Sequence, residues 1–114
     1  MDKICTSLEQ SNELIKLGID LKTADMYWHK KFDGTLSLRT DNLMIKLDTP
    51  CWSLAALLGV LPEGIIKNYY VPNLQKENGK YSIAYGKDEL LCIADNPVDA
   101  CYEMIEKLHT ENLI

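Results

Sequence analysis

The dipeptide Asn78-Gly79 constrains the fold of this chain more than any other feature, because it separates two runs of alternating apolar residues. Both residues tolerate the positive φ angles of a type I′ turn, so the pair predicts a tight β-hairpin. A two-residue turn also sets the register of the strands that it joins. The predicted cross-strand pairs are Lys76 with Tyr81, Leu74 with Ile83, and Pro72 with Tyr85.

A third strand is predicted after the loop that contains Gly86. The loop length permits Leu90 to face Tyr85 and Cys92 to face Ile83, which extends the apolar face of the hairpin. Proline cannot donate a ladder hydrogen bond, so we expect the strand that contains Pro72 at an edge of the sheet.

The last helix of the chain has a clear start, with Asn96 as the N-cap and Pro97 at the first helical position. Its apolar residues recur at helical spacing and form one continuous stripe. The stripe consists of Val98, Cys101, Ile105 and Leu108, widened by Ala100 and Met104. We expect this helix to cover one side of the three-stranded sheet.

The first helix is predicted to begin at Thr6, with Glu9 as the partner in a capping box, and to end at Gly18. Gly18 tolerates the left-handed conformation that closes many helices, and Ile19 can then close over Leu14. The predicted inward stripe is Ile4, Leu8 and Ile15.

Residues 24–39 predict a second hairpin around Asp33-Gly34. A plain two-residue turn would pair Trp28 with Arg39 and place the apolar residues beside charged ones. A type I turn followed by Gly34 in a G1 bulge instead pairs Trp28 with Leu38. We prefer the bulged register because it keeps the apolar residues on one face.

Residues 43–47 alternate in polarity and predict a third short strand in this half of the chain. A second helix is then predicted from Thr49 as N-cap and Pro50 to Pro62. Residues 51–61 carry almost no charge, so this helix is either buried in the core or presents apolar surface to a partner.

These elements predict the α+β fold class in a single domain, residues 1–114, with antiparallel strands packed with three helices. The strands form an N-terminal hairpin plus a C-terminal three-stranded meander. The length of 114 residues suits one hydrophobic core. The apolar fraction of 46% and the charged fraction of 25% are ordinary for a globular protein.

The net charge of −5 argues against a protein that binds nucleic acid by neutralising phosphates. The densest basic group is Lys30-Lys31 beside His29, which we interpret as the solvated tip of a hairpin. The N-terminus lacks the pattern of a signal peptide, and the longest apolar run is too short to cross a bilayer. We therefore expect a cytoplasmic protein with reduced cysteines and no membrane partner.

No residue pattern predicts a metal site or a cofactor. Zinc ligands normally occur as close pairs, and the four cysteines and two histidines have no such spacing. The best candidate for covalent chemistry is Cys51, because the predicted helix N-terminus near it would favour the thiolate. His29 or His109 would have to act as its base.

The aromatic residues suggest a surface for a partner protein. Tyr69 and Tyr70 are adjacent, so in a strand they point to opposite faces and at most one packs against the main core. Trp52 suits the core by its size, yet it adjoins the apolar helix. The predicted partner-binding residues are Tyr69, Tyr70 and Trp52, and the bulged hairpin at Gly34 is a further candidate surface.

Three segments of the chain resemble a family of small uncharacterised proteins of gut Bacteroidetes and their phages and mobile elements. The segments are residues 94–105 (ADNPVDACYEMI), residues 24–28 (ADMYW) and residues 50–54 (PCWSL). The family has no known activity, so the resemblance implies an intracellular accessory protein and no particular site.

The leading functional prediction is an accessory protein that works by protein–protein binding, with an unidentified partner or as a homo-oligomer. The absence of a catalytic pattern leaves the enzyme assignment uncertain, leaning towards no enzyme. The first alternative is a small enzyme or ligand-binding module that uses Cys51 with a histidine. The second is a nucleic-acid-associated phage protein, for which binding would weaken steeply with salt.

Overall fold

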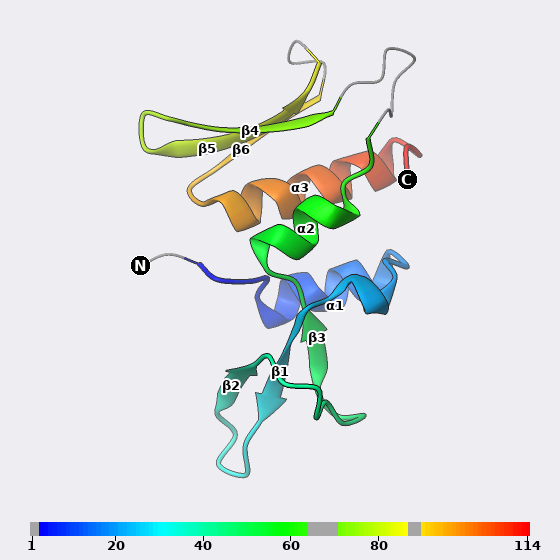
Figure 1. The fold of residues 1–114 in the computed structure, drawn as a ribbon, viewed down its shortest axis with the longest axis vertical. Coiled ribbons are helices and arrows are strands. Elements are labelled where there is room, and N and C mark those ends of the chain that lie inside the picture. The colour runs from blue at the N-terminus through cyan, green and yellow to red at the C-terminus, as the bar shows by residue number, and fades with distance from the viewer. Residues whose placement is uncertain (1–2, 64–70, 87–89) are drawn as a thin grey trace.

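The computed structural model describes residues 3–63, 71–86 and 90–114. Helices and antiparallel sheets succeed one another along the long axis, with overall dimensions of 49 × 30 × 21 Å. Figure 1 shows the C-terminal meander at one end, then α3 (Pro97–Thr110) and α2 (Leu54–Val60), then α1 (Leu8–Lys16), and the N-terminal sheet at the other end. The predicted α+β fold is confirmed.

The C-terminal sheet consists of β4 (Pro72–Glu77), β5 (Lys80–Tyr85) and β6 (Leu90–Ala94), in the order β4-β5-β6. The predicted register is confirmed at every quoted pair in both hairpins. Asn78 and Gly79 have φ angles of 53° and 75°, as a type I′ turn requires. Pro72 lies on an edge strand, where its missing N–H costs no ladder bond.

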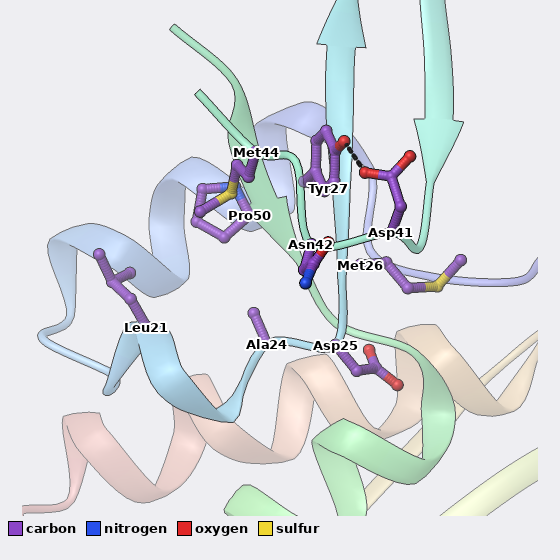
Figure 2. A pocket seen from close by; sticks show the side chains of 9 residues that line it. All are labelled: Leu21, Ala24, Asp25, Met26, Tyr27, Asp41, Asn42, Met44 and Pro50. Atoms are coloured by element: carbon purple, nitrogen blue, oxygen red, sulfur yellow. Dashed lines mark hydrogen bonds between the residues drawn. The ribbon is translucent and has the colours of Figure 1, made fainter. Parts of the chain in front are cut away.

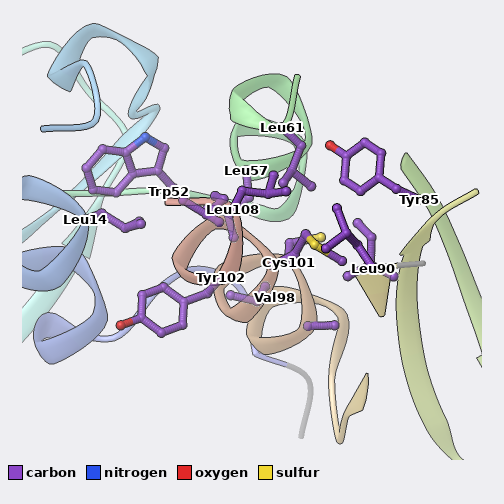
Figure 3. Packing of buried hydrophobic residues seen from close by; sticks show 14 residues of the cluster. Leu14, Trp52, Leu57, Leu61, Tyr85, Leu90, Val98, Cys101, Tyr102 and Leu108 are labelled. Atoms are coloured by element: carbon purple, nitrogen blue, oxygen red, sulfur yellow. The ribbon is translucent and has the colours of Figure 1, made fainter. Parts of the chain in front are cut away.

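The main core forms where α3 packs against β5 and β6 on one side and α2 on the other. Figure 3 shows the buried side chains of this core. The stripe predicted on α3 is confirmed, since all of its members are buried. From the sheet, Ile83, Tyr85 and Leu90 are buried in the same cluster, and the Tyr85 hydroxyl donates to the Pro62 carbonyl at 2.8 Å.

Helix α1 is shifted by one residue from its predicted start. Ser7, not Thr6, is the N-cap, and the capping box is completed by Gln10 rather than by Glu9. The predicted end is confirmed: Gly18 has a φ of 84°, and the Ile19 N–H donates to the Leu14 carbonyl at 3.1 Å.

The face that α1 buries also differs from the prediction. Ser11 and Leu14 are buried, whereas Ile4 and Ile15 are exposed. The sequence pattern was weak here because a buried serine replaces an apolar residue.

A set of polar contacts fastens the segment before α1 to the start of α3. Asp99 accepts hydrogen bonds from Lys3 Nζ at 2.7 Å and Gln10 Nε2 at 2.8 Å, while its other oxygen accepts from Asn96 at 2.8 Å. Partial burial raises the pKa of Asp99, but these hydrogen bonds outweigh burial and hold the pKa below its usual range.

The N-terminal sheet contains β1 (Met26–Lys30), β2 (Leu36–Arg39) and β3 (Thr49–Cys51), in the order β2-β1-β3. The bulged register is confirmed, because Trp28 pairs with Leu38. Gly34 has a φ of 88°, and its N–H donates to the Lys31 carbonyl at 3.0 Å, which closes the turn.

The third strand of this sheet was placed wrongly at residues 43–47. The strand that pairs with β1 is β3, and residues 43–47 form a loop before it. The dipeptide Thr49-Pro50, which we expected to start a helix, lies in this strand instead. Pro50 lies on an edge strand of the sheet, a position that tolerates proline.

Helix α2 therefore starts later than predicted, with Ser53 as its N-cap. Its Leu57 is fully buried, and its other large apolar residues, Leu54, Leu58 and Val60, are partly buried against the core. Of the two open interpretations for this apolar segment, the structure supports burial.

Two glycines provide a paired test of the backbone. Gly79→Ala should lower the free energy of unfolding by about 1–2 kcal/mol, because an L side chain is strained at positive φ. Gly59→Ala should raise it by about 0.5–1 kcal/mol, because Gly59 is helical and an added methyl meets no atom within 4 Å. Urea denaturation of both variants measures the difference. Equal shifts would contradict the type I′ turn.

Candidate functional site

Cys51 does not occupy the position that made it a candidate nucleophile. It lies in β3, fully buried, and not at the N-terminus of α2. Its S–H donates to Cys5 Sγ at a sulfur–sulfur distance of 3.6 Å. The hydrogen bond to Cys5, together with burial, raises the pKa of Cys51, which opposes its use as a thiolate nucleophile.

The two histidines lie elsewhere. His29 Nδ1 is 2.7 Å from Asp48 Oδ1, and His109 lies in the last turn of α3. Cys51 therefore has a second thiol as its hydrogen-bond partner, and the predicted Cys–His arrangement is not formed.

Two aspartates of the first half, Asp25 and Asp41, have structural roles. Both line the cavity shown in Figure 2, which has a volume of about 340 Å³. Asp41 accepts from the Tyr27 hydroxyl and from the Leu43 N–H, and Asp25 accepts from the Ser53 N–H and hydroxyl. The hydrogen bond to Asp41 raises the pKa of Tyr27 and lowers that of Asp41. Both carboxylates therefore link segments of the chain through hydrogen bonds.

Among residues 3–63, 71–86 and 90–114, no three His, Cys, Asp or Glu side chains group closely enough to hold a metal ion. No helix within these ranges combines the length and the apolar character needed to cross a bilayer.

The strongest candidate surface lies at the outer end of the N-terminal sheet. Half of the large hydrophobic side chains that are exposed in the described residues lie between positions 32 and 47. Phe32 at the hairpin tip is 115% exposed, and Leu47 and Ile45 in the following loop are 87% and 55% exposed. Exposed apolar side chains concentrated in this way are typical of interaction sites.

The loop that carries Ile45 and Leu47 is held against the sheet by side-chain hydrogen bonds. Asp48 accepts from the Ile45 N–H at 2.9 Å and contacts His29 at 2.7 Å. The Ile45 N–H, together with His29, lowers the pKa of Asp48. Asp41 anchors the other end of the loop through Tyr27. The apolar side chains are therefore presented by a loop that is fixed at both ends.

The hairpin tip and this loop enclose an open groove of about 590 Å³. We call it the tip groove; its lining residues are His29, Lys30, Lys31, Phe32, Asp33, Arg39, Ile45 and Leu47. The lining is unusual for an acidic chain, because three full positive charges lie beside one carboxylate. The tip groove thus combines apolar and basic lining residues.

Of the three predicted partner-binding residues, Trp52 lies in the described part of the chain, and it does not line the tip groove. Tyr69 and Tyr70 lie outside the described residues. Trp52 is fully buried in the core, and its indole N–H donates to Thr23 Oγ1 at 2.9 Å, so it offers no surface to a partner. Gly34, at the bulged hairpin that the sequence suggests as a further candidate surface, follows Phe32 and Asp33, which line the groove.

Two of the exposed apolar residues that line the tip groove, Ile45 and Leu47, lie in the segment for which the sequence predicts a strand. Leu43, Ile45 and Leu47 alternate as in a half-buried strand, whereas in the loop all three are exposed. The short strand β3 takes their place beside β1.

No protein-family model, curated protein or solved structure matches this chain. The resemblance to the family of gut Bacteroidetes and phage proteins stays a prediction.

Proposed function

We propose that this protein acts by binding another protein through the tip groove. The observation that carries the proposal is the nearly complete exposure of Phe32 and Leu47, which both line the groove. Large apolar side chains of this kind anchor protein interfaces, because their burial removes substantial area from water at low cost in conformational entropy.

The charges around the groove favour a particular class of partner. Lys30, Lys31 and Arg39 line it, and His29 is already engaged with Asp48. A partner segment that inserts an apolar side chain between Phe32 and Leu47, and carries acidic residues beside it, would satisfy both features. Charge complementarity of this kind sets specificity and the association rate.

Two other functions predicted from the sequence receive less support. The buried position of Cys51 beside Cys5 argues against an enzyme that uses this thiol with a histidine. The three basic residues of the groove could contact nucleic acid, but the apolar side chains between them have no role in binding phosphates.

Selection from a displayed library of random peptides tests the proposal without a known partner. Against the immobilised wild-type protein, we expect enrichment of peptides with an apolar residue flanked by aspartate or glutamate. The Phe32→Asp/Leu47→Asp variant should bind the enriched peptides at least about tenfold more weakly, because both apolar anchors are lost. Isothermal titration calorimetry on synthetic peptides measures this change.

Ile93→Asp provides the matched control, since Ile93 is 57% exposed on β6, in the other sheet. It should leave peptide binding unchanged. The Lys30→Glu/Lys31→Glu variant should shift the selection from acidic to basic peptides. Failure to enrich any peptide family, or enrichment that survives the Phe32→Asp/Leu47→Asp change, would rule out this function for the groove. Tight, salt-sensitive retention of single-stranded nucleic acid instead would favour the nucleic-acid function.

A further inference from the structure

Cys5 and Cys51 bring two thiols into contact, and the proposed function leaves both unused. The two sulfurs are 3.6 Å apart, although 46 residues separate the cysteines in the sequence. Both side chains are buried, with exposed fractions of 4% and 0%. Such proximity needs an explanation in the packing of the two segments.

The backbone holds the two segments together independently of the thiols. Cys5 forms an antiparallel bridge with Ser53, and the Thr6 N–H donates to the Trp52 carbonyl at 2.9 Å. Thr6 Oγ1 also accepts from the Trp52 N–H at 3.0 Å. The cysteines are therefore brought side by side by fixed main-chain contacts, and not by flexible surface loops.

We propose that Cys5 and Cys51 form a reversible disulfide by thiol–disulfide exchange with a low-molecular-weight disulfide such as glutathione disulfide. The sulfurs need to approach by about 1.5 Å to reach bonding distance, which rotation about the Cα–Cβ bonds can supply. This site is a modification site that goes beyond the proposed binding function and does not depend on it.

The two thiols have different roles in the exchange. Cys5 retains a small exposed surface and Cys51 retains none, so a small disulfide reaches Cys5 first. The hydrogen bond from the Cys51 S–H also lowers the pKa of Cys5, against the effect of burial. The residue before Cys5, Ile4, is exposed as well. Cys5 is thus the attacking thiolate, and Cys51 is the thiol that resolves the mixed disulfide.

The exchange balances in two steps. Cys5 Sγ attacks one sulfur of glutathione disulfide, the disulfide bond of glutathione breaks, and one glutathione thiolate leaves. Cys51 then loses its proton, its sulfur attacks Cys5 Sγ, and the second glutathione thiolate leaves. Two electrons pass from the protein to glutathione, and the protons of the two protein thiols end on the two glutathione thiols.

Peptide mapping of the native wild-type protein tests the proposal. After incubation with glutathione disulfide and alkylation of the remaining thiols, trypsin should release residues 4–16 joined to residues 47–67. Cys92 and Cys101 both lie in the peptide of residues 88–107, so a bond between them cannot produce this linked pair. Dithiothreitol should separate the two peptides.

Two variants and a thermal measurement sharpen the test. Cys51→Ala should trap Cys5 as the mixed disulfide with glutathione, and Cys92→Ala should leave the linked peptides unchanged. The oxidised wild-type protein should melt roughly 10 °C above the reduced protein, because the bond closes a long loop of the unfolded chain. If the two peptides stay separate under native conditions, or become linked only in denaturant, the assignment is wrong.

Discussion

Trp52→Ala is expected to lower the free energy of unfolding by about 3–5 kcal/mol, the largest effect of any single substitution considered for this chain. The indole is fully buried, and Figure 3 shows it beside Leu14, between α1 and the main core. Its removal leaves a cavity and also deprives Thr23 Oγ1 of a hydrogen bond. Urea denaturation followed by circular dichroism measures the loss.

Phe32→Ala is the matched control, because Phe32 is an aromatic residue that is completely exposed. It should change the free energy of unfolding by less than about 0.5 kcal/mol. A large loss of stability in Phe32→Ala would contradict the exposure of Phe32, and a small loss in Trp52→Ala would contradict the burial of Trp52. The pair thus separates a residue that holds the fold from one that is available to a partner.

Thr6→Val is expected to cost about 1–3 kcal/mol, although the two side chains have nearly the same shape. Thr6 is fully buried, and its hydroxyl both accepts from the Trp52 N–H at 3.0 Å and bonds Ser11 Oγ at 2.8 Å. Valine leaves the main-chain N–H of Trp52 without a partner in the interior, and a buried unpaired donor carries its full desolvation cost.

Thr110→Val provides the comparison, since the hydroxyl of Thr110 is exposed and bonds only the Glu106 carbonyl of its own helix. Its expected cost is about 0.5 kcal/mol or less, because water can replace the lost hydrogen bond. Thermal or urea denaturation of the two variants under the same conditions decides the point. Equal costs would show that the hydroxyl of Thr6 adds nothing beyond its volume.

The C-terminal half of the fold could be predicted from the sequence because each signal there is local. Asn78-Gly79 sets the register by turn geometry alone. Asn96-Pro97 starts α3, because asparagine favours the N-cap and proline favours the first helical position. The apolar stripe of α3 then specifies which side of the helix packs. The turn residues, the helix cap and the apolar periodicity all predict the same elements, and such consistency makes a prediction reliable.

The N-terminal half depends more on contacts between distant residues. Thr6 looks like an N-cap, but its hydroxyl is used by Trp52, and Ser7 takes the cap. Thr49-Pro50 looks like a helix start, but pairing with β1 makes it a strand. In both places a tertiary hydrogen bond overrides a local preference, which no pattern along the chain can reveal.

The candidate surface was found only in part for the same reason. The bulge at Gly34 follows from side-chain alternation, so the hairpin tip could be located in advance. The contribution of residues 43–47 could not, because alternation predicts a strand whether or not a partner strand is free. The pairing of Cys5 with Cys51 had no signal, since it results from the bridge between Cys5 and Ser53.

The contacts that Asp99 makes with Lys3 and Gln10 have a consequence for the order of folding. They join residues separated by 96 and 89 positions, so the loop that they close contains most of the chain. Closing a long loop costs entropy that is recovered only when the last element is in place. During synthesis, α3 emerges after α1 and both sheets. The residues around Lys3 are therefore made well before the contacts that fix them can form.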